Sequence, residues 1–158
     1  KTLLLISKIE NGQFPQSSEV DMAILAEESV NLHQEIYGHK NIEANITVTQ
    51  HFLIQMDEQM ASVLVGNLVK NAFVYTPSGG SIEISMSEDR FSVSNTGNAP
   101  LDREKVFRRF YQPSGRKEGA TGLGLALVYS VCVNNGLDIT YDYIDGKHIF
   151  AIILKKSK

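Results

Sequence analysis

The segment that decides the fold, residues 57–77, reads DEQMASVLVGNLVKNAFVYTP. Asp57 is a suitable N-cap for a helix, and Thr76-Pro77 is a suitable stop. A buried amide without partners costs about 1–3 kcal/mol, so asparagines on the apolar face need partners, either loop backbone or a ligand. At 100° per residue, one face of this helix carries apolar side chains and two asparagines: Met60, Val63, Leu64, Asn67, Leu68, Asn71 and Tyr75.

Length and composition describe an ordinary globular chain. Its 158 residues are enough for one domain with a core, and 42% of them are hydrophobic. The net charge of −3 does not favour nucleic acid as a partner, and we expect none. The single cysteine, Cys132, lies in an apolar run, which excludes a disulfide framework and a zinc cluster and is typical of a core residue in a reducing compartment.

The sequence contains neither a signal peptide nor an apolar run of membrane-spanning length. We therefore expect no direct membrane contact by this domain. The chain begins at Lys1 rather than at methionine, so we expect a fragment of a longer protein whose membrane segments, where it has them, lie outside this sequence.

Helical spacing predicts two helices before residue 57, at residues 1–10 and 19–37, separated by a linker at 11–18. Two short strands with alternating apolar residues follow at 43–49 and 51–56. The positions predicted to line one side of each helix are Leu3, Leu5, Ile6 and Ile9 in the first and Val20, Ile24, Ala26, Val30 and Ile36 in the second.

After the central helix, alternation predicts strands at 81–87 and 90–95, and it places Asn95 on the inward face of the second strand. Residues 96–120 form a long polar loop, with one short helix expected at 103–111; loops of this length are usually functional or disordered.

The last third of the chain predicts a helix and a hairpin. Residues 121–134 form an apolar helix closed by Asn135-Gly136, and two strands flank Asp145-Gly146, a pair suited to a two-residue turn. The whole pattern predicts an α+β fold in which an antiparallel sheet carries helices on one face.

Three polar features could converge on one site: the asparagine pair Asn67 and Asn71, the strand end Asn95-Thr96-Gly97, and the run GATGLGL at residues 119–125. The glycine run opens a helix, where backbone N–H groups and the helix dipole favour an anion such as phosphate. Tight helix packing is the alternative explanation. The third glycine of a dinucleotide-binding motif would fall at Leu127, and no Walker motif is present.

Four stretches together resemble the sequence boxes of the sensor histidine kinase ATP-binding domain, in the same order and at similar spacing: NLVKNAFVYTP, VSNTG, VFRRFYQ and GATGLGLALV. That domain belongs to a superfamily shared with gyrase, MutL and a heat-shock chaperone. The resemblance implies a two-layer α/β sandwich with a mixed, mostly antiparallel sheet, the Bergerat ATP-binding fold. It also implies two units: residues 1–11 as the remnant of the second helix of a dimerisation domain, and residues 12–158 as the catalytic domain, with a lid at about 98–120.

The resemblance also implies roles for individual residues. Asn71 matches a magnesium ligand, Asn67 would line the phosphate end, Tyr75 would lie against adenine, and Asn95 stands where most members carry an aspartate that accepts from the adenine amino group. None of the four histidines lies in a phosphoacceptor context, so we expect surface or structural roles for His33, His39, His51 and His148. The remaining residues implied in ATP binding are Gly97, Arg109, Thr121, Gly122, Leu123, Gly124 and Leu125, with Arg109 also a candidate catalytic residue.

Several positions depart from the family pattern. Asn95 replaces the acid, Val74 replaces a lysine, Gln112 replaces an arginine, and residues 98–100 lack a glycine. An alternative interpretation is therefore a degenerate, non-catalytic nucleotide-binding or interaction module of the same fold. Lys70 is interpreted as a surface residue, and charge compensation for the phosphates would come from the lid: Arg108, Arg109, Arg116 or Lys117.

The resemblance implies the catalytic domain of a bacterial two-component sensor histidine kinase, with ATP and Mg²⁺ bound. It would transfer the γ-phosphoryl group to a histidine on a separate dimerisation domain, for relay to an aspartate of a response regulator. The implied location is the cytoplasm, with the parent protein a candidate for anchoring in the inner membrane. An ATPase of the same superfamily is a rival, but its water-activating glutamate would fall at Asn67, which cannot act as a base.

Overall fold

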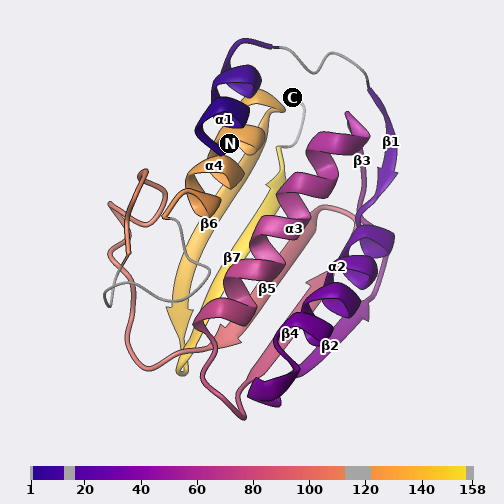
Figure 1. The fold of residues 1–158 in the computed structure, drawn as a ribbon. Helices are drawn as coiled ribbons and strands as arrows, with labels where there is room; N and C mark the ends of the chain where they lie inside the picture. The colour runs from indigo at the N-terminus through magenta and orange to yellow at the C-terminus, as the bar shows by residue number, and fades with distance from the viewer. Residues whose placement is uncertain (1, 13–16, 113–121, 156–158) are drawn as a thin grey trace.

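The computed structural model describes residues 2–12, 17–112 and 122–155 (Figure 1). Within them a five-stranded sheet has the order β2-β4-β5-β7-β6, and a separate two-stranded ladder joins β1 to β3. The elements, in chain order, are α1 Thr2–Glu10, β1 Ser18–Asp21, α2 Met22–Ile36, the 3-10 helix η1 Gly38–Lys40, β2 Glu43–Val48, β3 Leu53–Met56, α3 Glu58–Tyr75, β4 Ser81–Met86, β5 Arg90–Thr96, α4 Gly124–Asn134, β6 Leu137–Ile144 and β7 Lys147–Leu154.

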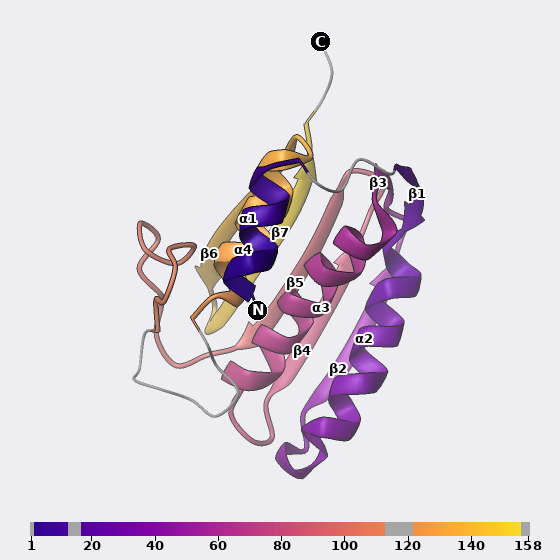
Figure 2. The same ribbon diagram turned by 45° about the horizontal axis from the view of Figure 1, so that its top comes forward.

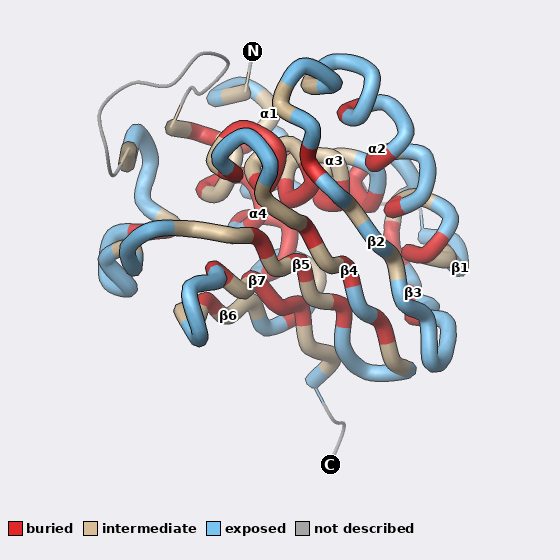
Figure 3. Tube along the Cα trace, turned by 90° about the horizontal axis from the view of Figure 1, so that it is seen from below, coloured by how far each residue is buried: buried red, intermediate tan, exposed pale blue. Residues whose placement is uncertain are grey.

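The molecule has two layers. Helices α2, α3 and α4 lie side by side over one face of the sheet, and α1 lies over α4 (Figures 1 and 2). Viewed along the layers, buried positions concentrate where helices and sheet meet (Figure 3). Only the β2–β4 pair of the large sheet is parallel; its other pairs are antiparallel. The predicted α+β sandwich with a mixed, mostly antiparallel sheet is confirmed.

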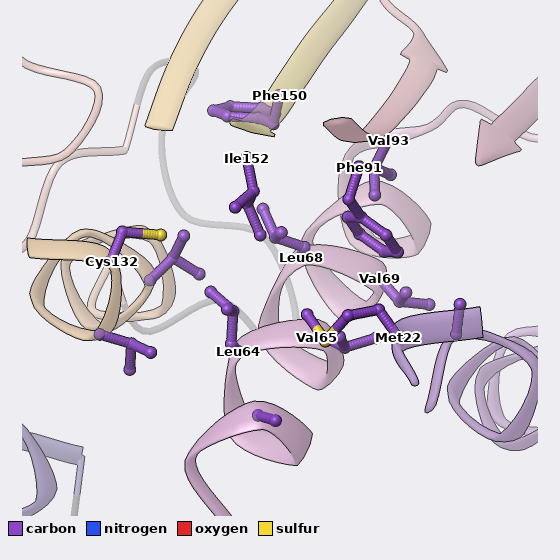
Figure 4. Packing of buried hydrophobic residues seen from close by; sticks show 14 of the residues in the cluster. Met22, Leu64, Val65, Leu68, Val69, Phe91, Val93, Cys132, Phe150 and Ile152 are labelled. Carbon is purple, nitrogen blue, oxygen red and sulfur yellow. The ribbon is translucent and has the colours of Figure 1, made fainter. Parts of the chain in front are cut away.

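Helix α3 is the centre of the core, as its sequence predicts. Asp57 caps it by accepting a hydrogen bond from the Met60 N–H (3.1 Å), and the Thr76 hydroxyl closes its end on the Ala72 carbonyl oxygen (2.6 Å). Full burial of an apolar side chain such as leucine, valine or phenylalanine stabilises the folded state by about 1.5–3 kcal/mol, compared with leaving it exposed. The core around α3 is formed by Leu64, Val65, Leu68 and Val69 with Met22, Phe91, Val93, Cys132, Phe150 and Ile152 from neighbouring elements (Figure 4).

The start and the buried face of α2 differ from the prediction. Residues 18–21 pair with β3 as a strand, and the helix begins at Met22, where the Asp21 side chain accepts from the Ala23 N–H (3.0 Å). Residues 19–21, which the helical spacing assigned to the helix, therefore belong to a β-strand instead. The helix is also rotated about its axis, so that Ile24 and Ile36 are 57% and 55% exposed. The buried positions are Met22, Ala23, Ala26, Val30 and His33.

Helix α1 forms where the sequence predicts it. Ile6 and Ile9 are buried against the core, and the helix packs on α4. Leu3, expected on the same face, is 43% exposed. In the described part of the chain, no helix has the length and hydropathy needed to span a membrane.

The segment at 103–111 was predicted as a short helix but forms successive turns instead, with isolated backbone hydrogen bonds such as Val106 N–H to the Asp102 carbonyl oxygen (2.9 Å). The last helix was predicted at 121–134 but begins at Gly124, because Gly122 has a φ of +76°, which a right-handed helix does not allow. Its predicted C-terminal end and the predicted hairpin are confirmed. Helix α4 ends before Gly136, whose φ is +68°. The β6–β7 hairpin turns at Asp145 and Gly146, with φ of +51° and +75°, as a primed turn requires.

Candidate functional site

One cavity of about 680 Å³ lies between α3, the first turn of α4, the adjoining ends of β5 and β7, and the loop that follows β5. It is lined by both polar and apolar side chains, which is typical of a site for a small organic ligand. The lining residues are Asn67, Lys70, Asn71, Val74, Tyr75, Pro77, Asn95, Gly97, Asn98, Ala99, Pro100, Leu101, Asp102, Val106, Tyr111, Gly122, Gly124, Leu125, His148 and Phe150.

The two asparagines of α3 line this cavity but differ in their partners. Asn67 donates from Nδ2 to the Val63 carbonyl oxygen of its own helix (2.8 Å), and its Oδ1 lies close to Gly124, where an added Cβ would be 3.2 Å away. Among the described residues, the Asn71 side chain has no hydrogen-bond partner. The Asn71 amide is therefore available to a ligand, whereas the Asn67 amide also helps to set the spacing between α3 and α4.

The first turn of α4 forms another wall of the cavity. Gly122 adopts a φ of +76°, and a Cβ there would lie 2.6 Å from the Phe110 Cα. The Phe110 N–H donates to the Gly122 carbonyl oxygen (2.6 Å), which ties the loop to the helix. Among the described residues no side chain caps this turn of α4. The backbone N–H groups of the turn and the positive end of the helix dipole favour an anion.

The sheet supplies the opposite end of the cavity. Asn95 is 2% exposed and donates from Nδ2 to the Thr96 carbonyl oxygen (3.2 Å). Gly97 is fixed at both of its peptide groups: its N–H donates to the Gly146 carbonyl oxygen (3.0 Å), and its own carbonyl oxygen accepts from the Tyr143 hydroxyl (2.9 Å). This end is therefore built from strands held in register.

Tyr75 closes the cavity at the end of α3, and burial raises the pKa of its hydroxyl. The phenol is therefore neutral at physiological pH. A neutral aromatic face beside a cavity is suited to stacking on a planar ring.

Most of the residues that the sequence singled out meet in this cavity: Asn67, Asn71, Tyr75, Asn95, Gly97, Gly122, Gly124 and Leu125. Two others do not line it. Arg109 places Nη2 3.4 Å from Glu10 Oε1, and Leu123 is buried beside the wall. Thr121 lies outside the described residues, as do residues 113–120 of the predicted lid, which include Arg116 and Lys117.

Two further residues line the cavity, and the interpretation of the first needs correction. Lys70, interpreted as a surface residue, is half-buried and lines the cavity. For His148, expected at the surface or in a structural role, the structure shows a buried side chain that is 7% exposed, has Nδ1 2.8 Å from the Tyr141 hydroxyl oxygen and also lines the cavity. Strand alternation could have found His148, because Phe150 and Ile152 follow it on the same inward face.

The chain resembles known proteins in sequence and in fold. The sensor-like histidine kinase SenX3 of Mycobacterium tuberculosis is 27% identical over 143 residues, which cover 84% of this chain and 35% of that protein. The chain thus spans about a third of the length of this curated relative. The mycobacterial sensor histidine kinase MprB gives a TM-score of 0.75 at 25% identity, covering 87% of this chain and 97% of that one.

A further structure, full-length ShkA in complex with AMPPNP, gives a TM-score of 0.69 at 25% identity and covers 89% of this chain and 32% of that one. A family model described as histidine kinase-, DNA gyrase B-, and HSP90-like ATPase matches residues 56–157. This range contains every residue that lines the cavity. Because the match extends over well more than half of the sequence, the chain belongs to the histidine kinase-, DNA gyrase B- and HSP90-like ATPase family.

Proposed function

We propose that this chain is the ATP-binding catalytic domain of a sensor histidine kinase, which delivers the γ-phosphoryl group of ATP to a histidine on a separate helical domain. One observation carries the proposal: the first turn of α4 and the side-chain amide of Asn71 border the same cavity, whose far end holds Asn95 and Gly97. This arrangement offers an anion site at one end and a fixed polar edge at the other, as a nucleotide requires.

We assign the phosphates to the α4 end and the base to the sheet end. Backbone N–H groups at Gly124 and Leu125 would hold the phosphate oxygens, and Tyr75 would lie against the base. Asn71 fits Mg²⁺, because this ion takes few protein oxygen ligands and completes its shell with phosphate and water. When bound, the ion would neutralise phosphate charge. Lys70 would add a positive charge at the same wall.

In the proposed reaction a histidine nitrogen forms a bond to the γ-phosphorus, the bond between that phosphorus and the bridging oxygen breaks, and ADP leaves. Phosphoryl transfer asks mainly for positioning and charge neutralisation, which this chain would supply. An ATPase would need a base for water at the position of Asn67, and an amide cannot serve as one.

The proposal extends to the parent protein. We assign α1 to the end of the second helix of a dimerisation domain and residues 12–158 to the catalytic domain. The parent would then act as a homodimer whose phosphohistidine serves an aspartate of a response regulator, with this domain in the bacterial cytoplasm. Relatives named as sensor histidine kinases, such as SenX3, support the assignment to a kinase of this class.

Calorimetric titration with AMPPNP, with and without Mg²⁺, tests the site. We expect binding that tightens with Mg²⁺, and an Asn71→Ala variant that folds normally but loses most of the Mg²⁺ effect. Lys8→Ala, on an exposed position of α1, is the matched control and should bind as the unaltered chain does. Absence of nucleotide binding would instead support the non-catalytic module.

Incubation with γ-labelled ATP tests the reaction. The chain alone should turn over little ATP and should acquire no stable phosphohistidine, while label should appear on a histidine-bearing helical domain of the parent protein supplied in trans. Rapid ATP hydrolysis by the chain alone would contradict the kinase assignment and favour an ATPase.

A further inference from the structure

His148 is a buried side chain of the cavity to which the proposed function assigns no role. It lies near the start of β7, directly opposite Asn95 of β5 in an antiparallel pair. Side chains that face each other in this way project from the same face of the sheet, with Cβ atoms about 4.5–5.5 Å apart. His148 and Asn95 are therefore immediate neighbours at the base end, where β5 and β7 run side by side (Figure 1).

The imidazole ring of His148 is held in place on several sides. Its ring centroid lies 5.8 Å from that of Tyr141 and 5.1 Å from that of Tyr143. Gly97 also packs against the ring, so closely that a Cβ on Gly97 would be 2.1 Å from Nε2 and 2.3 Å from Cδ2. These contacts restrict the position of the ring.

A chain of hydrogen bonds favours one of the two neutral forms of the His148 ring. The Tyr141 oxygen accepts from the Leu101 N–H (2.9 Å) and lies 2.8 Å from His148 Nδ1. Among the described residues Nδ1 is the only acceptor within hydrogen-bond distance of this hydroxyl, so we assign the phenol hydrogen to the bond with Nδ1. A neutral imidazole that accepts at Nδ1 carries its hydrogen on Nε2.

The protonation states agree with this chain of hydrogen bonds. Burial lowers the pKa of His148, which keeps the ring neutral near pH 7. Burial also raises the pKa of Tyr141, which keeps its hydroxyl protonated and able to donate. Both shifts therefore leave Nε2 as a hydrogen-bond donor.

Each of the two side chains, both of which line the cavity, has one further polar atom: Nε2 of His148 and Oδ1 of Asn95. Neither atom has a hydrogen-bond partner among the described residues, where no fully buried side-chain nitrogen or oxygen lacks one. Neither atom is therefore fully buried, and both residues line the cavity. The base end accordingly presents one donor and one acceptor on neighbouring strands.

We propose that His148 is a specificity-determining residue that donates from Nε2 to ring nitrogen N1 of adenine, while Asn95 Oδ1 accepts from the adjacent amino group. Adenine carries this acceptor and this donor side by side on one edge, and guanine carries them in the opposite sense. The proposal rests on the nucleotide site proposed above. A site built to hydrogen-bond a ligand rejects an analogue that lacks the matching group.

The test compares ATP with 1-deaza-ATP, in which a C–H replaces N1, by calorimetry on the whole chain. The unaltered chain should bind the analogue at least about tenfold more weakly, because the Nε2–H would be left without an acceptor. His148→Phe keeps a planar ring without the donor and should bind both nucleotides with similar affinity. His148→Gln keeps an N–H near the position of Nε2 and should retain part of the discrimination.

Two controls isolate the contact. In 7-deaza-ATP the altered atom lies on a different edge of the base, so the ratio of its affinity to that of ATP should not change in His148→Phe. His39→Gln changes an exposed histidine outside the cavity and should leave the tenfold ratio intact.

Nitrogen-15 NMR of the imidazole tests the same claim without a nucleotide. In the folded chain near pH 7, we expect the spectrum to show a proton bound to Nε2 and an unprotonated Nδ1 that accepts a hydrogen bond. A proton on Nδ1 would overturn the proposal even where His148→Phe fails to fold. Equal affinities of the unaltered chain for ATP and 1-deaza-ATP would overturn it while leaving the nucleotide site standing, whereas failure to bind ATP would overturn both proposals.

Discussion

The two ends of the cavity are built in different ways. At the sheet end, side chains on three paired strands are fixed by hydrogen bonds, as in the bond between Tyr141 and His148 (2.8 Å). At the helix end, the wall is mostly backbone, and Gly122 and Gly124 bring it close to the ligand space. The sheet end can therefore be altered one side chain at a time, while the helix end tolerates few changes that add a Cβ.

The largest effect is expected at Gly122. An alanine there would need a positive φ and would place its Cβ 2.6 Å from the Phe110 Cα, a backbone atom that no side-chain rotation can move away. We expect Gly122→Ala to weaken ATP binding by about 30-fold, which corresponds to about 2 kcal/mol. Calorimetry measures this, with Gly38→Ala as the control because open space surrounds that glycine. An affinity within threefold of the unaltered chain would show that the helix end is not rigid.

The next effect is expected at Gly97, where the obstacle is a side chain. Gly97→Ala would press on His148 Nε2 and disrupt the bond to Tyr141, at a cost of about 1–3 kcal/mol in unfolding free energy. In a His148→Ala background the same change should cost much less, because the ring is gone. Chemical denaturation of the four proteins of this cycle gives the coupling. Equal costs in both backgrounds would show that the ring moves away freely.

These two ends also differ in how well the sequence predicted them. Asn67 and Asn71 were found because helical spacing is a local pattern, and the residues that stop α3 fix its length. The glycine run was found because positive φ and close approach leave few other residues to choose from. The Asp145-Gly146 turn fixed the register of β6 against β7 for the same local reason.

The partners that complete the sheet end were not predictable in this way. Pairing of Asn95 with His148 joins residues 53 positions apart, and it depends on the order of strands in the sheet. The bond between Leu101 and Tyr141 depends on the path of a loop, which has no periodic signal. The error at Val20 has a similar origin, since pairing with β3 outweighs helical spacing in residues 18–21.

A smaller effect should appear as pH falls. Burial lowers the pKa of His148 below 6.5, its ordinary value, so the unfolded chain takes up this proton first as acid is added. The contribution of the neutral His148 ring to the unfolding free energy is therefore fully present above pH 6.5. It is lost as the pH falls from 6.5 toward the lower pKa of the folded state. His148→Gln should flatten the decline of unfolding free energy between pH 7.5 and 5.5, measured by urea denaturation. An unchanged slope would show that the ring titrates normally.

The smallest effect on stability and on ATP affinity is expected at the contact between α1 and the loop that precedes the helix end of the cavity. Arg109 and Glu10 are about half exposed and 3.4 Å apart, so Glu10→Gln should change the unfolding free energy by about 0.5 kcal/mol or less. Removing this partner frees an arginine that the family resemblance assigns to ATP. Affinity for ATP should therefore stay equal or rise slightly, and Lys155→Gln, which breaks the exposed pair with Asp138, is the matched control. A loss of affinity above fivefold would show instead that contact with α1 holds the loop in its binding conformation, and that the helix end depends on an element outside its own wall.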